Sequence, residues 1–189
     1  MELKKVDVKE FQKNLYKEYK KIFPSDERKS LGHIKKLFVR GNLEILEILD
    51  EDKIVGFFIT NILKNNPYVI LDYFAIFPEN QSKGYGSKAI NLLKETYNDY
   101  DGIYIEVEKV NDNEQDGNKQ RRIKFYEKSG FQYLGYDIDL FNVIFSTYLL
   151  SINKVHESDK HAIDKIIEIY KSIFGNFIFQ KKCKFIKIN

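Results

Sequence analysis

The order of apolar and polar residues along the first half of the chain predicts two helices and three strands. The expected segments are a strand at 2–6, helices at 7–23 and 25–41, and strands at 43–49 and 54–63. Asp7 and Glu10 have the spacing of a capping box, in which each side chain accepts a hydrogen bond from the other residue's backbone. Pro24 is expected to end the first helix. The polar turn 50–53 makes the two later strands a hairpin.

The second half alternates strands with helices. The expected elements are strands at 68–77 and 103–108, helices at 88–97 and 121–129, strands at 131–136 and 141–150, and a helix at 158–174. Residues 68–77 are almost all apolar, as expected of a strand that is covered on both faces. Residues 177–188 alternate loosely and predict either an extra strand or an extended arm. This order of elements is typical of a mixed α/β fold, with a hairpin half followed by a βαβ half.

Composition narrows the class of protein. The 189 residues most simply form one domain, and 43% hydrophobic residues can supply its core. A net charge of only +3, with Lys and Glu interleaved, disfavours a nucleic-acid-binding surface. No segment has the length of a membrane span, and the N-terminus leads into no signal-type core, so we expect a cytoplasmic protein. Cys183 is the one cysteine and the three histidines are scattered, so neither a disulfide nor a metal site is expected.

The stretch at residues 81–87, QSKGYGS, lies between an expected strand and an expected helix. Its two glycines permit a tight turn and let a ligand approach the backbone closely. The unpaired N–H groups and the dipole at the start of a helix attract an anion. Lys83 adds a mobile positive charge. We interpret the stretch as a cradle for a phosphate or pyrophosphate, with a ligand-free tight turn as the alternative.

Two common nucleotide-binding motifs do not match this glycine loop. Ala89 stands where the dinucleotide-binding motif has its third glycine, and no acidic residue closes a strand at the expected distance. The Walker-type loop is also excluded, because no glycine precedes a Gly-Lys-Ser/Thr at the required spacing.

A second segment, residues 121–131 with the sequence RRIKFYEKSGF, follows the glycine loop one strand later. This segment and the loop, with residues 74–79 (FAIFPE) before it, together resemble the motifs of the GNAT superfamily of acyl-CoA-dependent N-acetyltransferases. The resemblance covers residues 43–150 in order. The pair Phe23-Pro24 and the residues after it also look like a bacterial branch of the superfamily.

The resemblance implies a GNAT-like central mixed sheet of about seven strands flanked by helices, with a C-terminal helical extension. Residues 1–150 would form the acetyltransferase domain, and residues 151–189 would pack on its core or on a partner subunit. Two neighbouring parallel strands would separate, and the pantetheine arm of acetyl-CoA would bind their backbones like an added strand. The implied cofactor-binding residues are Phe74, Ala75, Ile76, Phe77, Gln81, Ser82, Lys83, Gly84, Tyr85, Gly86, Ser87, Asn118, Arg122 and Phe125.

The same resemblance assigns catalytic roles. Tyr126 matches the tyrosine that stands near the thioester sulfur and would protonate the departing thiolate, with a core tyrosine as the alternative. An attacking amine must be neutral, so a carboxylate has to remove its proton. Asp72, Glu106 and Glu108 are the candidate bases. Asp72 lies in an apolar strand, where an unpaired charge is costly. For the two glutamates the alternative is an exposed edge or a salt bridge to a nearby arginine.

The sequence departs from the family pattern at the asparagine that usually contacts the pantetheine. Lys119 stands at that position, with Asn118 one residue earlier, and Arg122 replaces a usual small residue. The acceptor-binding pocket is expected to draw on the first helices and on the loops at 111–118 and 137–139.

The expected function is acetyl transfer from acetyl-CoA, as a co-substrate, to a small-molecule or peptide amine in a ternary complex. The alternative is a GNAT-like sensor or interaction module that binds CoA without turnover. Nucleic acid and membrane are not expected as partners, and a homodimer is one arrangement that the C-terminal extension would allow.

Overall fold

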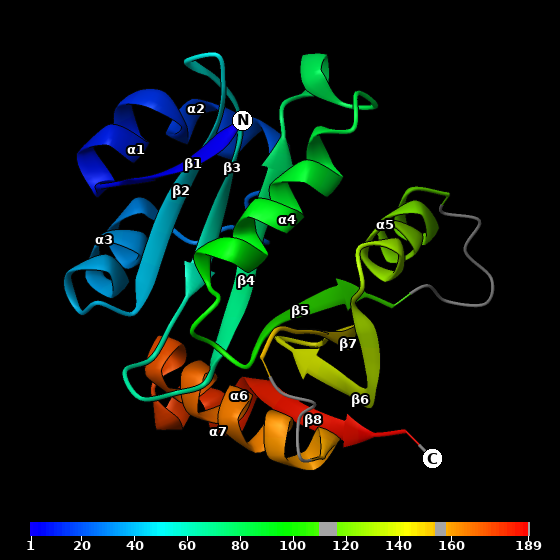
Figure 1. Cartoon of the computed structure of the whole chain (residues 1–189). Helices are drawn as coiled ribbons and strands as arrows, with labels where there is room; N and C mark the ends of the chain where they lie inside the picture. Colours follow the sequence, from blue (N-terminus) through cyan, green and yellow to red (C-terminus); the bar gives the residue numbers. More distant parts are fainter. Residues whose placement is uncertain (110–116, 154–157, 189) are drawn as a thin grey trace. The chain divides into compact units, whose positions relative to one another are not determined.

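A computed structural model of the chain describes residues 1–109, 117–153 and 158–188 (Figure 1). The strands are β1 (Glu2–Val6), β2 (Leu43–Asp50), β3 (Lys53–Asn61), β4 (Tyr68–Ile76), β5 (Gly102–Glu108), β6 (Gln132–Leu140), β7 (Val143–Ser151) and β8 (Cys183–Lys187). The helices are α1 (Val8–Asn14), α2 (Tyr16–Ile22), α3 (Leu31–Val39), η1 (Pro78–Asn80), α4 (Tyr85–Thr96), α5 (Gly117–Lys128), α6 (Asp159–Phe174) and α7 (Asn176–Lys182). The strands form one sheet in the order β1-β2-β3-β4-β5-β7-β6-β8. This confirms the mixed α/β class, with eight strands in the described residues where about seven were expected.

The chain divides into two compact units, and each is described by itself. The first comprises residues 1–64 and 71–97, and the second comprises residues 65–70 and 98–189. In the first unit β1 pairs with β2 and β2 pairs with β3, both antiparallel. The β2–β3 hairpin turns through Glu51 and Asp52, both with positive φ, as the polar turn predicted. Side chains such as Phe11, Leu37 and Phe57 are completely buried in the core of this unit.

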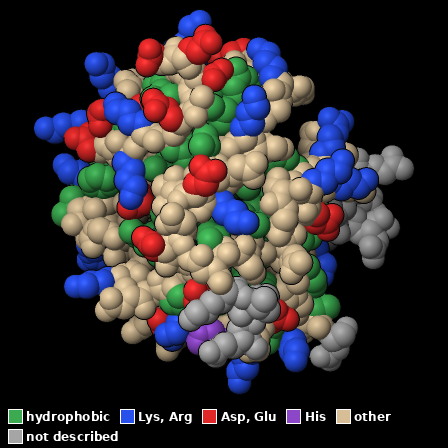
Figure 2. All heavy atoms as spheres, in the orientation of Figure 1, with side chains coloured by type: hydrophobic (Ala, Val, Ile, Leu, Met, Phe, Trp, Pro, Cys, Tyr) green, Lys and Arg blue, Asp and Glu red, His purple; other side chains and the backbone are tan. Residues whose placement is uncertain are grey.

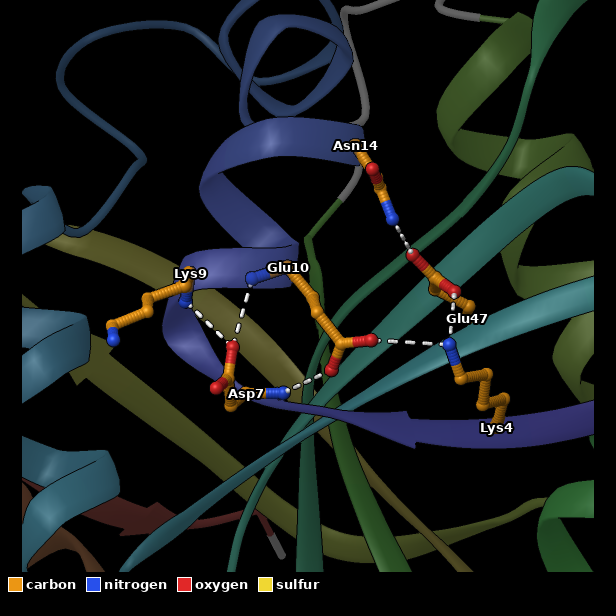
Figure 3. A network of polar contacts seen from close by, with 6 residues as sticks. All are labelled: Lys4, Asp7, Lys9, Glu10, Asn14 and Glu47. Carbon is orange, nitrogen blue, oxygen red and sulfur yellow. Dashed lines mark hydrogen bonds and ion pairs between the residues drawn. The ribbon is translucent and has the colours of Figure 1, made fainter.

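The capping box at the start of α1 is present and is joined to a buried carboxylate (Figure 3). The Asp7 carboxylate accepts hydrogen bonds from the backbone N–H groups of Lys9 and Glu10, and Glu10 accepts one from the backbone of Asp7. Lys4 lies 3.1 Å from Glu10 and 3.9 Å from Glu47. Asn14, the last residue of α1, donates to Glu47 at 2.8 Å. Polar contacts therefore fix both ends of α1 to β1 and β2.

Helices cover both faces of β2 in the first unit (Figure 1). Glu47 receives its hydrogen bond from α1. Glu44, three residues earlier and hence on the opposite face, receives one at 2.8 Å from the hydroxyl of Tyr97, which follows α4. Tyr97 also lies 2.6 Å from the hydroxyl of Thr60 on β3. The C-terminal end of α4 is thereby held on the sheet.

In the second unit the first residues of β4 pair with β5, and β5 continues the sheet through β7 and β6 to β8. The β4–β5 pairing is parallel and joins Tyr68, Val69 and Ile70 to residues 102–104. The pairings β5–β7, β7–β6 and β6–β8 are antiparallel. Helix α6 buries the face expected from its periodicity and lies beside β8, with the rings of Tyr170 and Phe185 at 6.0 Å (Figure 1). Residues 177–188 supply both the end of a helix and an edge strand.

The N-terminal helices differ from the prediction at two points. One expected helix is two, because the helix breaks at Leu15. Phe11, Leu15 and Tyr19 are all fully buried, so the apolar spacing is the same on both sides of the break and cannot reveal it. The next helix begins at Leu31 with Ser30 as its cap, not at Ser25.

Tertiary contacts hold the segment before α3 out of a helix. The Tyr73 hydroxyl donates to the Glu27 carbonyl and accepts from the Lys29 N–H. The Arg28 guanidinium donates to the carbonyl of Lys20 at 2.7 Å. These bonds satisfy backbone groups that a helix would have satisfied itself.

The expected loop at 137–139 is wrong, because these residues lie inside β6. A register irregularity between Tyr133 and Asp137, with Gly135 at φ 69°, puts Asp137 in a buried position. Its carboxylate accepts from Lys109, Tyr133 and Ser146. Polar partners from neighbouring residues thus replace, for Asp137, the solvent contact that an acidic segment suggested. Of the expected loop at 111–118, residues 111–116 lie outside the described residues, and Asn118 belongs to α5.

Within the described residues, none of the helices has both the length and the apolar surface that crossing a membrane requires.

Candidate active site

The first unit carries the glycine loop, which lies between η1 and α4. Residues 81–84 are exposed, and Gly84 is the N-cap of α4 with φ 80° and ψ 0°. A side chain at this φ is strained, so the turn favours glycine. A Cβ added at Gly84 would meet no heavy atom of the described residues within 4 Å, so open space lies in front of the turn. In the part of the chain that the structure describes, no side chain caps the N-terminus of α4, and its first amides are those of Tyr85, Gly86 and Ser87.

Three side chains of the loop donate hydrogen bonds, two to carbonyls in the preceding residues 76–79 and one to β2. The Gln81 amide donates to the Ile76 carbonyl at 2.9 Å, and the Lys83 ammonium donates to the Glu79 carbonyl at 2.7 Å. The Tyr85 hydroxyl donates to an Asp50 oxygen at 2.6 Å, which lowers the pKa of Asp50. Lys83 was expected as a mobile charge; here its ammonium has a backbone partner. The loop therefore presents main-chain donors, while its side chains brace its shape.

The four residues before the loop are placed by the sheet. Phe74 stacks on Phe58 with ring centroids 4.5 Å apart, and Ala75 and Phe77 are buried. The Phe77 N–H donates to the Val55 carbonyl at 2.9 Å. Its N–H is thus already used within the first unit, so a backbone contact of Phe77 to the pantetheine arm would have to involve its carbonyl.

Asp72, a candidate base, lies on β4 in the first unit in an ion pair. Lys29 places its ammonium 2.8 and 2.6 Å from the two carboxylate oxygens, and both side chains are only 12% exposed. The pair explains how an acidic residue is tolerated in an apolar strand. It also means that Asp72 would have to give up an ammonium contact in order to take a proton.

The second unit carries the other two candidate bases on β5. The Tyr170 hydroxyl of α6 donates to Glu106 at 2.7 Å. The Lys119 ammonium of α5 lies 2.8 Å from Glu108. The alternative to a catalytic role for Glu108 was a salt bridge to an arginine. Glu108 does form a salt bridge, but with a lysine. Glu106 has a neutral hydroxyl as its partner in that contact.

Tyr126 lies on the buried side of α5, 8% exposed, between the rings of Phe125 and Phe131 at 5.2 and 5.3 Å. Burial raises the pKa of Tyr126, the Arg122 guanidinium opposes that shift, and the Glu106 carboxylate adds to it. The hydroxyl is therefore protonated near neutral pH, as a general acid must be. Tyr126 and Glu106, which are twenty residues apart in sequence, interact electrostatically in the second unit.

The expected site residues thus fall into two groups. The first unit contains the glycine loop, Phe74–Phe77 and Asp72; the second contains Asn118, Arg122, Phe125, Tyr126 and the two glutamates. Lys29 and Tyr170 were missed as partners of the candidate bases. An acid in an apolar strand and a tyrosine among isoleucines each signal that a polar partner exists, but not where it lies. In the described ranges no three acidic, histidine or cysteine side chains are grouped as metal ligands.

The chain is similar to known proteins in sequence and in fold. A sequence model of the Acetyltransferase (GNAT) family matches residues 10–131. No curated protein sequence matched the chain.

Solved structures match over most of the chain. A GNAT-family acetyltransferase from Bacteroides thetaiotaomicron superposes with a TM-score of 0.69 at 21% identity, covering 93% of this chain and 99% of that one. A spermidine N-acetyltransferase chimera from Vibrio cholerae and hSSAT gives a TM-score of 0.60 at 15% identity, covering 79% of this chain and 93% of that one. The ribosomal-protein-S18-alanine N-acetyltransferase from Escherichia coli gives 0.57 at 17%, covering 82% and 96%. At these identities the structural likeness establishes the fold.

The family match covers more than half of the sequence and includes both the glycine loop and the segment around Tyr126. The chain therefore belongs to the GNAT family of acetyltransferases.

Proposed function

We propose that this protein transfers an acetyl group from acetyl-CoA directly to an amine in a ternary complex. The observation that carries the proposal is the start of α4, where an αL glycine leaves main-chain N–H groups without a side-chain cap among the described residues. Such a helix start fits the diphosphate of coenzyme A, because its amides and its dipole both favour an anion. The open space in front of Gly84 supports the same ligand.

Positive charge on α5 further supports an anionic co-substrate. Arg121, Arg122 and Lys124 are exposed there, and blue side chains gather over α5 in Figure 2. Elsewhere on the face in that figure basic and acidic side chains are interspersed. Arg122 would hold a phosphate oxygen, whereas Asn118 and Phe125 would contact the arm. Of these three contacts, only that of Arg122 is between two charged groups, so it should weaken most when salt is added.

The chemistry assigns one proton transfer to each of two side chains. Glu106 would take the proton of the amine, whose nitrogen then attacks the thioester carbonyl. As the C–S bond breaks, Tyr126 would give its proton to the thiolate, which leaves as the free thiol of CoA. Glu106 is preferred to Asp72 and Glu108 as the base, because its charge interacts with Tyr126, the proposed acid, within the second unit.

The acceptor is proposed to be a small-molecule or peptide amine. The similar structures include proteins named for acetylating spermidine and a ribosomal-protein alanine, which are amines of these two kinds. The remaining proposals are that residues 1–150 act as the acetyltransferase domain, that residues 151–189 are an extension docked on it or on the partner of a homodimer, and that the protein works in the cytoplasm.

Incubation with acetyl-CoA and a panel of amines, followed by detection of free thiol, tests the proposal. Thiol release that depends on one class of amine, with an acetylated product of the expected mass, is the expected result. Calorimetric binding of CoA without thiol release for any amine would favour the sensor module. No heat with acetyl-CoA or CoA would overturn the phosphate cradle and the function together.

A further inference from the structure

Helix α6, in the C-terminal region, delivers one polar group to a candidate catalytic carboxylate. The Tyr170 hydroxyl donates to Glu106 Oε2 at 2.7 Å, although the two residues are 64 positions apart. Tyr170 is 2% exposed and Glu106 is half-buried, so the donor side of the bond is shielded from water. The ring is fixed as well, because it packs edge-on against Tyr104 at 6.2 Å and stacks on Phe174 at 6.1 Å. A hydroxyl on a fixed, buried ring can hold a carboxylate in one orientation.

Tyr170 remains a donor throughout the pH range in which such an enzyme works. Burial raises the pKa of Tyr170 well above its usual value, and the neighbouring Glu106 charge and Tyr104 hydroxyl raise it further. The bond therefore runs from the hydroxyl to the ionised carboxylate. A hydrogen bond donated to the ionised form favours that form.

Among the described residues, four titratable side chains interact with the charge of Glu106. Tyr104 on β5, Tyr126 on α5, Tyr170 on α6 and Cys183 on β8 all interact with its charge. All four have raised pKa values, with burial as the main cause, and for Cys183 the value is about 11. They are thus neutral near pH 7. Across β7 the register neighbour of Glu106 is Thr147, which does not titrate. No neighbour in this set changes charge while Glu106 titrates.

We propose that Tyr170 is a positioning residue that keeps the Glu106 carboxylate ionised and aimed for proton abstraction from the acceptor amine. This inference rests on the function proposed above. It makes the C-terminal region part of the catalytic apparatus, because without α6 the base loses its buried donor. Tyr170 acts through Glu106 and itself touches neither the amine nor the thioester.

The hydrogen bond from Tyr170 to Glu106 predicts the direction in which the pH profile should shift when the hydroxyl is removed. A base must be deprotonated to work, so the acidic limb of the kcat/KM profile reports protonation of Glu106. Removing a donor to the carboxylate makes protonation easier and moves that limb to higher pH. A hydrogen bond to a charged group corresponds to a shift of about one to two pH units.

The test is Tyr170→Phe, which deletes one oxygen and keeps the ring. Ser172→Ala is the matched control, because it removes a hydroxyl from the same helix whose partner is the Ile169 carbonyl. The acidic limb should move up by about one to two units in Tyr170→Phe and should not move in Ser172→Ala. Near the wild-type midpoint kcat/KM should therefore fall about tenfold, while KM for acetyl-CoA and the melting temperature change little.

A double variant makes the test independent of any general damage to the fold. In a Glu106→Gln background the Tyr170→Phe change should have no further effect on the profile, because no titrating base remains. A limb that stays in place in Tyr170→Phe, or moves equally in the Gln background, would overturn the inference while leaving the acetyltransferase function intact. Absence of thiol release by the wild-type protein would overturn both.

Discussion

The glycine loop of the first unit and the Glu106–Tyr126 group of the second unit are built from different kinds of chemical group. The loop offers backbone N–H groups at the start of α4, and its own side chains are tied to carbonyls and to Asp50. The second group offers a carboxylate and a phenol whose properties depend on burial and on partners from other elements.

The two regions should therefore tolerate different changes. A main-chain site is insensitive to the loss of a side chain but sensitive to added bulk, charge or a change of backbone conformation. A side-chain site is sensitive to the loss of a single oxygen, because each oxygen carries a proton or a hydrogen bond. Variants in the two regions should therefore fail in different assays, the first in binding and the second in turnover.

The largest effect is expected from Gly84→Glu. The new carboxylate would lie in the space in front of the turn, at a φ of 80° that side chains adopt with strain. Calorimetry with acetyl-CoA should detect no binding.

Two controls sharpen this prediction. Gly41→Glu places the same charge at a comparable φ of 70°, also with no described atom within 4 Å, and should bind normally. Lys83→Ala removes only a side chain and should weaken binding about fivefold or less. Unchanged affinity in Gly84→Glu would refute the cradle.

The next largest effect is expected from Tyr126→Phe in the second unit. Loss of the proton donor should lower kcat roughly a hundredfold, within the usual range for general acids. The dissociation constant for acetyl-CoA, measured by calorimetry, should stay within experimental error. Full turnover would remove Tyr126 from the mechanism, and a loss of binding instead of turnover would erase the contrast between the two regions.

Asp72 tests whether the first unit also contributes a base. Lys29→Met would remove the ammonium from the Asp72 carboxylate, whose side chain is 12% exposed in the wild type, and the free energy of unfolding should fall by about 3 kcal/mol. The double variant Lys29→Met/Asp72→Leu should recover most of that loss and retain turnover. Urea unfolding and thiol release measure the two properties. A stable but inactive double variant would make Asp72 catalytic after all.

The smallest effect is expected at the start of α1, which belongs to neither the glycine loop nor the Glu106–Tyr126 group. Asp7→Ala removes the cap that accepts from Lys9 and Glu10 (Figure 3), and should lower the free energy of unfolding by about 1 kcal/mol. Lys9→Ala, which leaves the cap in place, is the control. Equal midpoints in urea for Asp7→Ala and the wild type would mean that the other contacts of α1 suffice without the cap.

Local sequence determined the elements that depend on neighbouring residues. The capping box at Asp7, the hairpin turn at 51–52, the cap at Ser158 and the end of α6 at Gly175 are all where the pattern predicted them. The glycine loop was also readable, because a strand, an αL turn and a helix start follow each other within a few residues. Short-range hydrogen bonds and steric limits fix such features.

The tertiary structure alone decided the partners of the charged residues and the irregular segments. Lys29 pairs with Asp72, which lies 43 residues away in sequence, and Tyr170 donates to Glu106, which lies 64 residues away. The non-helical segment before α3 and the buried Asp137 in β6 likewise depend on contacts from other elements. An acidic residue in an apolar segment predicts a polar partner, because an unpaired charge is costly away from water. Only the packing of distant elements determines which group reaches the carboxylate, such as the Lys29 ammonium at Asp72 or the Tyr170 hydroxyl at Glu106.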